Sequence, residues 1–315
     1  MSLSEALDRN REDALEKVGS LLEINDEDKR LLTSVKEILR IHTKFVSRIS
    51  DHVERPDVNV SLTIRCIARK TQESLGAIVT LVQEDQGYYG MALLRPMCEE
   101  LIFARFIKTL PPDDANEYLR IKALTEILEG QRAQGEFFAK QQKRFLRNRP
   151  PEPKKRPTNT EHLPVQIKEL RKKLRALGEK HGWVKKPRDR ALPSVWYMAK
   201  ATDSEDAYAF FYHAASSAVH ANLHHLMRMV WGDATTGYFT VANRNFDTYY
   251  RKFVLVYGAW LAMEVMTEVQ EEFPSEWPEE EDDAYGIWLA FLIEPAVRYC
   301  FPPIVTKEEL EWQSP

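Results

Sequence analysis

The chain has 315 residues, 43% of them hydrophobic and 29% charged, which is typical of a folded globular protein with a sizeable core. Its 12 glycines are too few for a turn-rich β-sandwich and argue against a glycine-fingerprinted nucleotide fold. The sequence begins with polar residues, and its longest uncharged apolar run, 253–263, is too short to cross a bilayer. We therefore expect a cytoplasmic protein without a signal peptide. Three widely spaced cysteines inside apolar patterns are expected to be buried thiols: Cys66, Cys98 and Cys300.

Apolar residues recur at steps of three and four along most of the chain, and this periodicity predicts amphipathic helices. Asn25 and the acidic residues after it form the cap and first turn of the first helix. The segment 87–110 is apolar nearly all round, as the central helix of a bundle should be. Extended structure is expected only within 231–245. The predicted helices cover 29–49, 61–83, 87–110, 114–146, 165–180, a short stretch from 194, 204–231, 245–273 and 283–300.

The clearest break in the pattern is 147–164, where five prolines stand among charged residues in a segment too polar to form a core. The helices on either side of it are too apolar to stand apart, so the break does not divide the chain into two domains. We predict an all-α fold, a multi-helix bundle with a basic, partly irregular insertion. Residues 1–139 would form the N-terminal half of the bundle, 140–190 the basic insertion or arm, and 191–315 the C-terminal half.

Charge is distributed unevenly along the chain. Residues 140–190 contain 18 Lys and Arg against 5 Asp and Glu, whereas the whole chain has a net charge of −4. A solvated lysine-rich helix and loop would explain this run, but it is also typical of a surface that binds nucleic acid. The apolar stripe there is too thin to favour a membrane. We expect His181 and Trp183 to stack on bases. The residues expected to bind phosphates are Lys154, Lys155, Arg156, Arg171, Lys172, Lys173, Lys185, Lys186 and Arg188.

The segment FYHAASSAVHANLHHL, residues 211–226, contains four of the chain's eight histidines. In a helix it places Tyr212, Ser216 and His220 on one stripe, four residues apart. His220 and His224 have the spacing of metal ligands, but zinc or iron would also need carboxylates or cysteines nearby, and no HExxH motif is present. We therefore predict no metal and no other cofactor. Histidines of a helix core remain the alternative to a functional site.

A second candidate cluster lies in the apolar helix 87–110, where Arg95 and Glu99 are four residues apart and Pro96 stands between them. Charged side chains on such a helix are stable only when they are paired. We expect Arg95 to lie next to the stripe formed by Tyr212, Ser216 and the histidine after them. A structural ion pair that fixes the register of the bundle and a functional cluster are both open interpretations.

This combination resembles a bacterial family of unknown function, the one numbered five-six-seven-seven. The shared features are Arg95 and Glu99 on a central apolar helix, a long polar helix after it, and the stripe of Tyr212, Ser216 and His220. Such families are in turn remotely similar to the HEPN helical superfamily, many of whose members are metal-independent ribonucleases in toxin and phage-defence systems. The HEPN signature has an arginine before the histidine on one helix. The helix from Ser204 has none before His220, so Arg95 would supply that cation from the neighbouring helix.

From the charge pattern and this resemblance we predict a nucleic-acid-associated protein, directed at RNA, with a role in phage defence or stress. As an enzyme it would be a metal-independent ribonuclease in which His220 transfers a proton and Arg95 stabilises the phosphorane charge. Glu99, Tyr212 and Ser216 would complete the catalytic group. The alternative is a non-catalytic helical scaffold or dimerising subunit, so the expected partners are RNA or another nucleic acid, a second copy of the chain or a partner protein, and no membrane.

Overall fold

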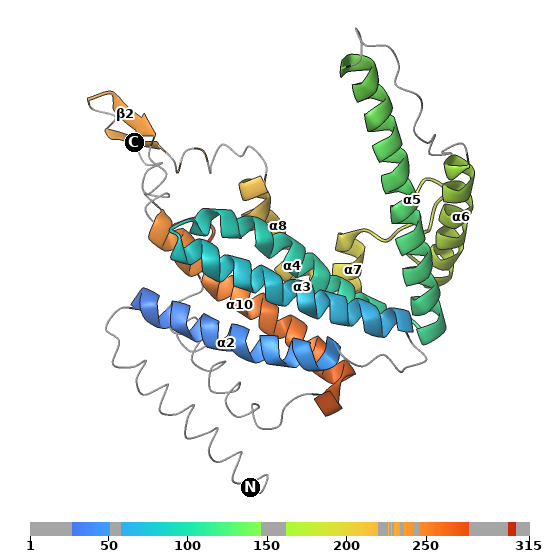
Figure 1. The fold of residues 1–315 in the computed structure, drawn as a ribbon, viewed down its shortest axis with the longest axis horizontal. Helices are drawn as coiled ribbons and strands as arrows, with labels where there is room; N and C mark the ends of the chain where they lie inside the picture. The colour runs from blue at the N-terminus through green and yellow to red at the C-terminus, as the bar shows by residue number, and fades with distance from the viewer. Residues whose placement is uncertain are drawn as a thin grey trace, which may run out of the picture.

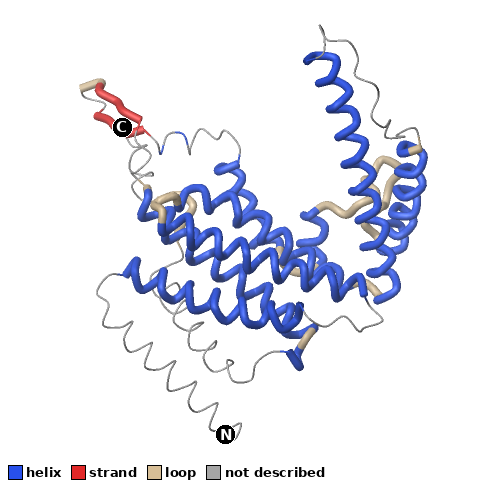
Figure 2. The backbone as a smooth tube through the Cα atoms, viewed as in Figure 1, coloured by secondary structure: helices blue, strands red, loops and turns tan. Residues whose placement is uncertain are grey.

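The structure is a computed structural model, and it describes residues 27–50, 58–145, 162–219, 226, 228, 230–233, 236–241, 246–276 and 302–306. The elements in chain order are α2 (Glu27–Ser50), α3 (Val58–Gln83), α4 (Gly87–Thr109), α5 (Pro112–Phe145), α6 (Leu163–His181), α7 (Val195–Ala201), α8 (Glu205–Val219), β1 (Val230–Asp233), β2 (Tyr238–Val241), α10 (Asp247–Glu272) and the short 3-10 helix η1 (Pro274–Glu276). Helices dominate the described part of the chain (Figures 1 and 2), which confirms the predicted all-α class.

Helix α4 lies at the centre of the bundle, as its all-round apolar pattern predicts. It packs against α3, α8 and α10, while α2 covers α3 and α10 (Figure 1). Leu94, Met97 and Ile102 are among its buried side chains. A Cβ atom on Gly90 would lie 3.3 Å from the side chain of Val254 on α10, so the two helices are in close contact at this glycine. Helices from both ends of the sequence therefore share one hydrophobic core.

Helices α5 and α6 form a hairpin at one end of the bundle. The C-terminal part of α5 projects away from the bundle, and α6 runs beside it (Figure 1). Leu163, Ile167 and Leu174 anchor α6, since all three side chains are buried. Its cationic side chains stand on the exposed faces of the same helix. The helical part of the basic insertion is thus held against α5 by an apolar stripe.

The expectation that His181 and Trp183 stack on bases is wrong. Only 8% of the Trp183 surface is exposed, because its ring packs 5.9 Å from the ring of Phe106 and 5.8 Å from that of Tyr118. His181 stacks on Trp183 with 5.7 Å between ring centroids, and its Nε2 lies 2.8 Å from Asp114 at the start of α5. Both rings join the loop after α6 to the core, where packing of large aromatic surfaces gives more stabilisation than exposure would.

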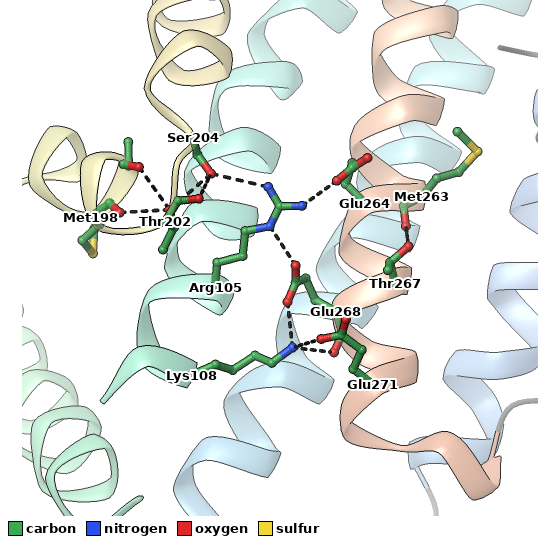
Figure 3. Close-up of polar contacts among 11 residues, drawn as sticks. Arg105, Lys108, Met198, Thr202, Ser204, Met263, Glu264, Thr267, Glu268 and Glu271 are labelled. Atoms are coloured by element: carbon green, nitrogen blue, oxygen red, sulfur yellow. Dashed lines mark hydrogen bonds and ion pairs between the residues drawn. The ribbon is translucent and has the colours of Figure 1, made fainter. Parts of the chain in front are cut away.

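A half-buried ion network links α4 to α10 and to the turn before α8 (Figure 3). Arg105 bonds Glu264 at 2.5 Å and Glu268 at 2.7 Å, and Lys108 bonds Glu268 at 2.7 Å. Burial raises the pKa of Glu268, but the hydrogen bonds from Lys108 and Arg105 outweigh it, so the pKa is lowered overall. Arg105 also donates to the Ser204 hydroxyl at 3.4 Å. The start of α8 is therefore fixed relative to α4.

The expected extended segment is present as an antiparallel hairpin of β1 and β2. The helix predicted over 204–231 does not reach its expected end, because Val230 and Trp231 belong to β1. Cys98 is buried, but Cys66 is exposed on α3, so the prediction of a buried thiol there is wrong. The predicted helix at 283–300 lies outside the described residues. Among the helices that are described, none has the length and apolarity needed to span a membrane.

Candidate nucleic-acid interface

Four predicted site residues meet where α4 packs against α8. The Arg95 Nε atom donates to Glu99 Oε1 at 2.8 Å, and its terminal nitrogen donates to the Ser216 hydroxyl at 3.3 Å. The guanidinium carbon lies 4.6 Å from the centre of the Tyr212 ring, which is the geometry of a cation–π contact. The predicted juxtaposition of Arg95 with this stripe is confirmed. His220, the fifth residue predicted for the cluster, lies outside the described residues.

The helical repeat of α8 explains why this stripe faces Arg95. Phe211, Ala214 and Ala215 are buried against the bundle, and the two alanines let the helices approach closely. Tyr212 and Ser216 follow by one position, so they lie at the edge of that contact on the side where Arg95 emerges. Local sequence therefore sets the stripe, and the packing of α8 on α4 brings it to the arginine.

The Arg95–Glu99 pair is accessible from solvent. About a third of each side chain is exposed, 28% for Arg95 and 31% for Glu99. The hydrogen bond to Glu99 raises the pKa of Arg95 above its ordinary value, so the guanidinium stays cationic. A partly exposed pair of this kind adds little to stability, since solvent screens it. Its charge is available to a ligand, unlike that of an ion pair sealed in the core.

A cleft of about 980 Å³ opens beside this cluster. The α4–α8 side contributes Arg95, Glu99, Tyr208 and Tyr212 to its wall. The opposite side consists of α5, α6 and the loop that leads into α7. Six side chains in the lining are cationic, two are carboxylates and three are aromatic. The cations are Arg95, Lys168, Arg171, Lys172, Arg175 and Arg190; the carboxylates are Glu99 and Glu129; the aromatic residues are Trp196, Tyr208 and Tyr212.

Half of these cations have no counter-charge among the residues that the structure describes. Arg171 bonds Glu129 on α5 at 2.6 Å, and Arg175 holds the loop after α6 through the carbonyl oxygen of Lys186 at 2.7 Å. The side chains of Lys168, Lys172 and Arg190, in contrast, form no ion pair or hydrogen bond with any residue that the structure describes, and all three residues are exposed. The cleft therefore has an excess of positive charge at its surface.

Three aromatic side chains line the same cleft as these cations. Trp196 and Tyr212 are 51% and 46% exposed, although both belong to helices with one face against the core. The ring centroids of Trp196 and Tyr208 are 6.0 Å apart, and those of Tyr208 and Tyr212 are 5.6 Å apart. Burial raises the pKa of Tyr208, and the nearby charge of Glu99 adds to the effect, so its hydroxyl is protonated at neutral pH. The three rings form a continuous row that ends at Arg95.

The phosphate-binding residues predicted from the sequence divide into three groups. Arg171 and Lys172 line the cleft. Lys173, Lys185, Lys186 and Arg188 are described but do not line it. Lys154, Lys155 and Arg156 lie outside the described residues.

Among the cationic and aromatic residues of the lining, sequence reasoning missed five: Lys168, Arg175, Arg190, Trp196 and Tyr208. Two of them carried a usable signal, because 168, 171, 172 and 175 have the spacing of one helical face. No comparable signal marked Arg190 or Trp196, which come to the cleft through the course of the loop and α7. Tyr208 is four residues before Tyr212, so it continues the predicted stripe by one turn.

Within the described ranges, no three His, Cys, Asp or Glu side chains are grouped so that they could hold a metal ion. The lining has six cationic side chains against two carboxylates, and this excess of positive charge suits an anionic ligand, while the aromatic rings offer flat apolar surface.

Comparison with known proteins places the chain in a family. No curated protein and no solved structure matches it significantly. The profile of a family of unknown function (DUF5677) matches residues 62–238, which is more than half of the chain. The match runs from α3 to β2 and includes Arg95, Glu99, Tyr212 and Ser216 as well as the cleft. The chain therefore belongs to the DUF5677 family of unknown function.

Proposed function

We propose that the chain binds the phosphate backbone of RNA in the cleft between α6 and the Arg95 cluster. The observation that carries this proposal is the set of three cations, Lys168, Lys172 and Arg190, that face the cleft without a partner among the described residues. Like charges held together repel one another, and a bound polyanion relieves this repulsion while releasing its own counterions. Arg95 adds a fourth cation from the opposite wall.

Glu99 supports RNA rather than DNA as the ligand. One of its carboxylate oxygens accepts from Arg95, and the other has no hydrogen-bond partner in the described part of the chain. A carboxylate in a cationic cleft repels phosphate but accepts a hydrogen bond from a ribose 2′-hydroxyl. That hydroxyl is the group by which a protein distinguishes RNA from DNA at a given site.

The test is a titration of a fluorescent single-stranded RNA at several salt concentrations. Binding through phosphate contacts should weaken as salt rises, with a log–log slope of about −0.7 for each phosphate neutralised on a single strand. In the double variant Lys168→Ala, Lys172→Ala the slope should become shallower by about 1.4, because two such contacts are lost.

A matched control removes the same charge outside the cleft. Lys185 and Lys186 are exposed lysines of the loop after α6 and do not line the cleft. Their side chains can be replaced without touching the backbone N–H groups that bond Asp189. Lys185→Ala, Lys186→Ala should keep the wild-type slope. An equal loss in both double variants would place the RNA elsewhere, and no binding even at low salt would favour the non-catalytic scaffold.

Cleavage of the bound RNA and a role in phage defence are proposed on other grounds than the charge of the cleft. They rest on the resemblance to HEPN ribonucleases and on the position of Arg95, whose guanidinium lies at the edge of the cleft. There it would stabilise charge that develops on a phosphate. The expected acid or base, His220, is tested by substitution below.

A further inference from the structure

We infer that Trp196 stacks on one unpaired nucleobase, so that the ligand of the cleft is single-stranded. This inference rests on the proposed RNA binding and adds the conformational class of the RNA. Its basis is the combination of an exposed tryptophan on a fixed helix, a row of tyrosines beside it, and cations in the lining of the same cleft that have no partner among the described residues.

The side chain of Trp196 is exposed, while the backbone around it is held in place by hydrogen bonds and by packing. The helix that carries it, α7, is capped by Ser194, whose hydroxyl accepts from the backbone N–H of Tyr197 at 3.1 Å. Met198 and Ala199 bury the other face of α7 in the core. The chain just before α7 is held by the indole N–H of Trp183, which donates to Ala191 at 2.9 Å. A rigid position of this kind lowers the entropy lost when a ligand binds.

The turn after α7 is fixed as well. Thr202 donates to the Ser204 hydroxyl at 3.2 Å, and Ser204 in turn accepts from Arg105 on α4 (Figure 3). The network that attaches α8 to the bundle thereby also attaches α7. Trp196 on α7 and Tyr212 on α8 are consequently held in a constant relation to Arg95.

The surroundings of Trp196 offer a contact for the base of a nucleotide and contacts for its phosphate. About half of the Trp196 surface remains open after its contact with Tyr208, which leaves area for a planar ring. Arg190 lies six positions earlier in the chain and lines the same cleft, as do Lys168 and Lys172. Aromatic rings next to a cationic groove are the arrangement by which proteins hold single strands. The cleft volume, 980 Å³, is at the upper end of the ~300–1,000 Å³ of small-molecule sites, so it has room for one or two nucleotides.

A duplex does not offer this contact. Each base inside a duplex, away from its two ends, is covered on both faces by its neighbours, so it must be unstacked before it can lie on Trp196. Double-stranded RNA is instead recognised through its shape and backbone. Of the two forms of RNA, only a single strand therefore presents a base that can stack on the exposed tryptophan. A protein partner would use the same apolar surface, but it would leave Lys168, Lys172 and Arg190 uncompensated unless it were acidic.

The experiment compares three probes against substitutions of one residue. The probes are a fluorescent single-stranded RNA, a blunt duplex of the same sequence, and inorganic polyphosphate, which has the charge but no bases. Trp196→Leu keeps an apolar side chain without the ring, and Trp196→Phe keeps a ring. Stacking contributes about 1–3 kcal/mol per base, so the leucine variant should bind single-stranded RNA about 5- to 150-fold more weakly.

The other expected results separate the ring from the charge. Trp196→Phe should stay within about threefold of the wild type for single-stranded RNA, because phenylalanine also stacks. Polyphosphate affinity should be the same in all three proteins. The duplex should bind the wild type more weakly than the single strand. Should the leucine variant not fold, Trp196→Gln provides the same comparison.

The results distinguish failure of base stacking from failure of the proposed RNA binding. If neither RNA nor polyphosphate binds, the proposed function itself is wrong, and the inference fails with it. If RNA binds but Trp196→Leu leaves its affinity unchanged, or lowers polyphosphate affinity equally, RNA binding stands and base stacking is overturned. Equal affinity for the duplex and the single strand would also overturn it. A single-stranded DNA of the same sequence that binds as well as the RNA would support the stacking and remove the preference for ribose.

Discussion

Arg95 on α4 lies with its guanidinium carbon 4.6 Å from the centre of the Tyr212 ring on α8. The contact joins two helices that are more than a hundred positions apart in the sequence, and it sits at the edge of the cleft. A lysine would keep the charge but not the planar group that bonds Glu99 and stacks on the ring. This relationship makes Arg95 the point at which the bundle and the candidate interface meet.

The contribution of this pair can be measured with a double-mutant cycle. We expect Arg95→Gln, Tyr212→Leu and the double variant to show a coupling free energy of about 0.5–1 kcal/mol in urea unfolding, the range of a partly exposed cation–π pair. The same cycle on RNA affinity should also be non-additive, because Tyr212 holds in place the guanidinium that contacts the RNA. Strictly additive effects in both cycles would contradict the contact.

Removing the negative charge of Glu129 should strengthen RNA binding, whereas removing a cation of the cleft should weaken it. The Glu129 carboxylate lines the cleft and holds Arg171 at 2.6 Å. In Glu129→Gln a negative charge is removed and Arg171 is released, so RNA should bind more tightly, by about 2- to 5-fold at low salt. Glu136→Gln is the matched control, because Glu136 lies further along α5 and is exposed but does not line the cleft. Tighter binding in both variants would show a general charge effect instead of a local one.

The stability of the fold should depend on pH through His42. This side chain is fully buried in α2, and desolvation lowers its pKa from 6.5 to about 3. The unfolded chain therefore takes up a proton below about 6.5 that the folded chain refuses, so stability is complete above that value and is lost as the pH falls. Between about pH 7 and pH 5 the loss should be about 2 kcal/mol.

Urea unfolding of His42→Gln at both pH values checks this expectation. Glutamine does not titrate, so the part of the pH dependence that comes from position 42 should vanish, although the variant is less stable than the wild type at neutral pH. A pH dependence identical to that of the wild type would show that another group is responsible.

The ribonuclease hypothesis depends on His220 and is tested by His220→Ala. If His220 transfers a proton during cleavage, the variant should lose cleavage of single-stranded RNA while its melting temperature and its RNA affinity stay close to those of the wild type. If the histidine is structural, the melting temperature should fall by several degrees, since an unsatisfied buried group costs about 1–3 kcal/mol. Absence of cleavage in both proteins would remove the enzymatic hypothesis and leave RNA binding in place.

The sequence by itself determined the helices and the pairing of the charged residues on α4. Apolar residues at steps of three and four require helical faces that can be buried, and α4, apolar on all sides, had to be central. Arg95 and Glu99 had to find partners because an unpaired charge on such a helix is costly. The i, i+4 spacing of Tyr212 and Ser216 placed both on one stripe. These statements hold because each depends only on neighbours along the chain.

Only the tertiary structure decided which aromatic residue is open and what the basic helix faces. Reasoning from composition chose Trp183 as the exposed ring, but Phe106 and Tyr118 from distant segments cover it, whereas Trp196 remains open. The α5–α6 hairpin turns the face with Lys168 and Lys172 toward the cleft beside Arg95. Periodicity shows which residues share a face of a helix. Which element packs on that face depends on the angles between helices, and these angles cannot be predicted from local sequence.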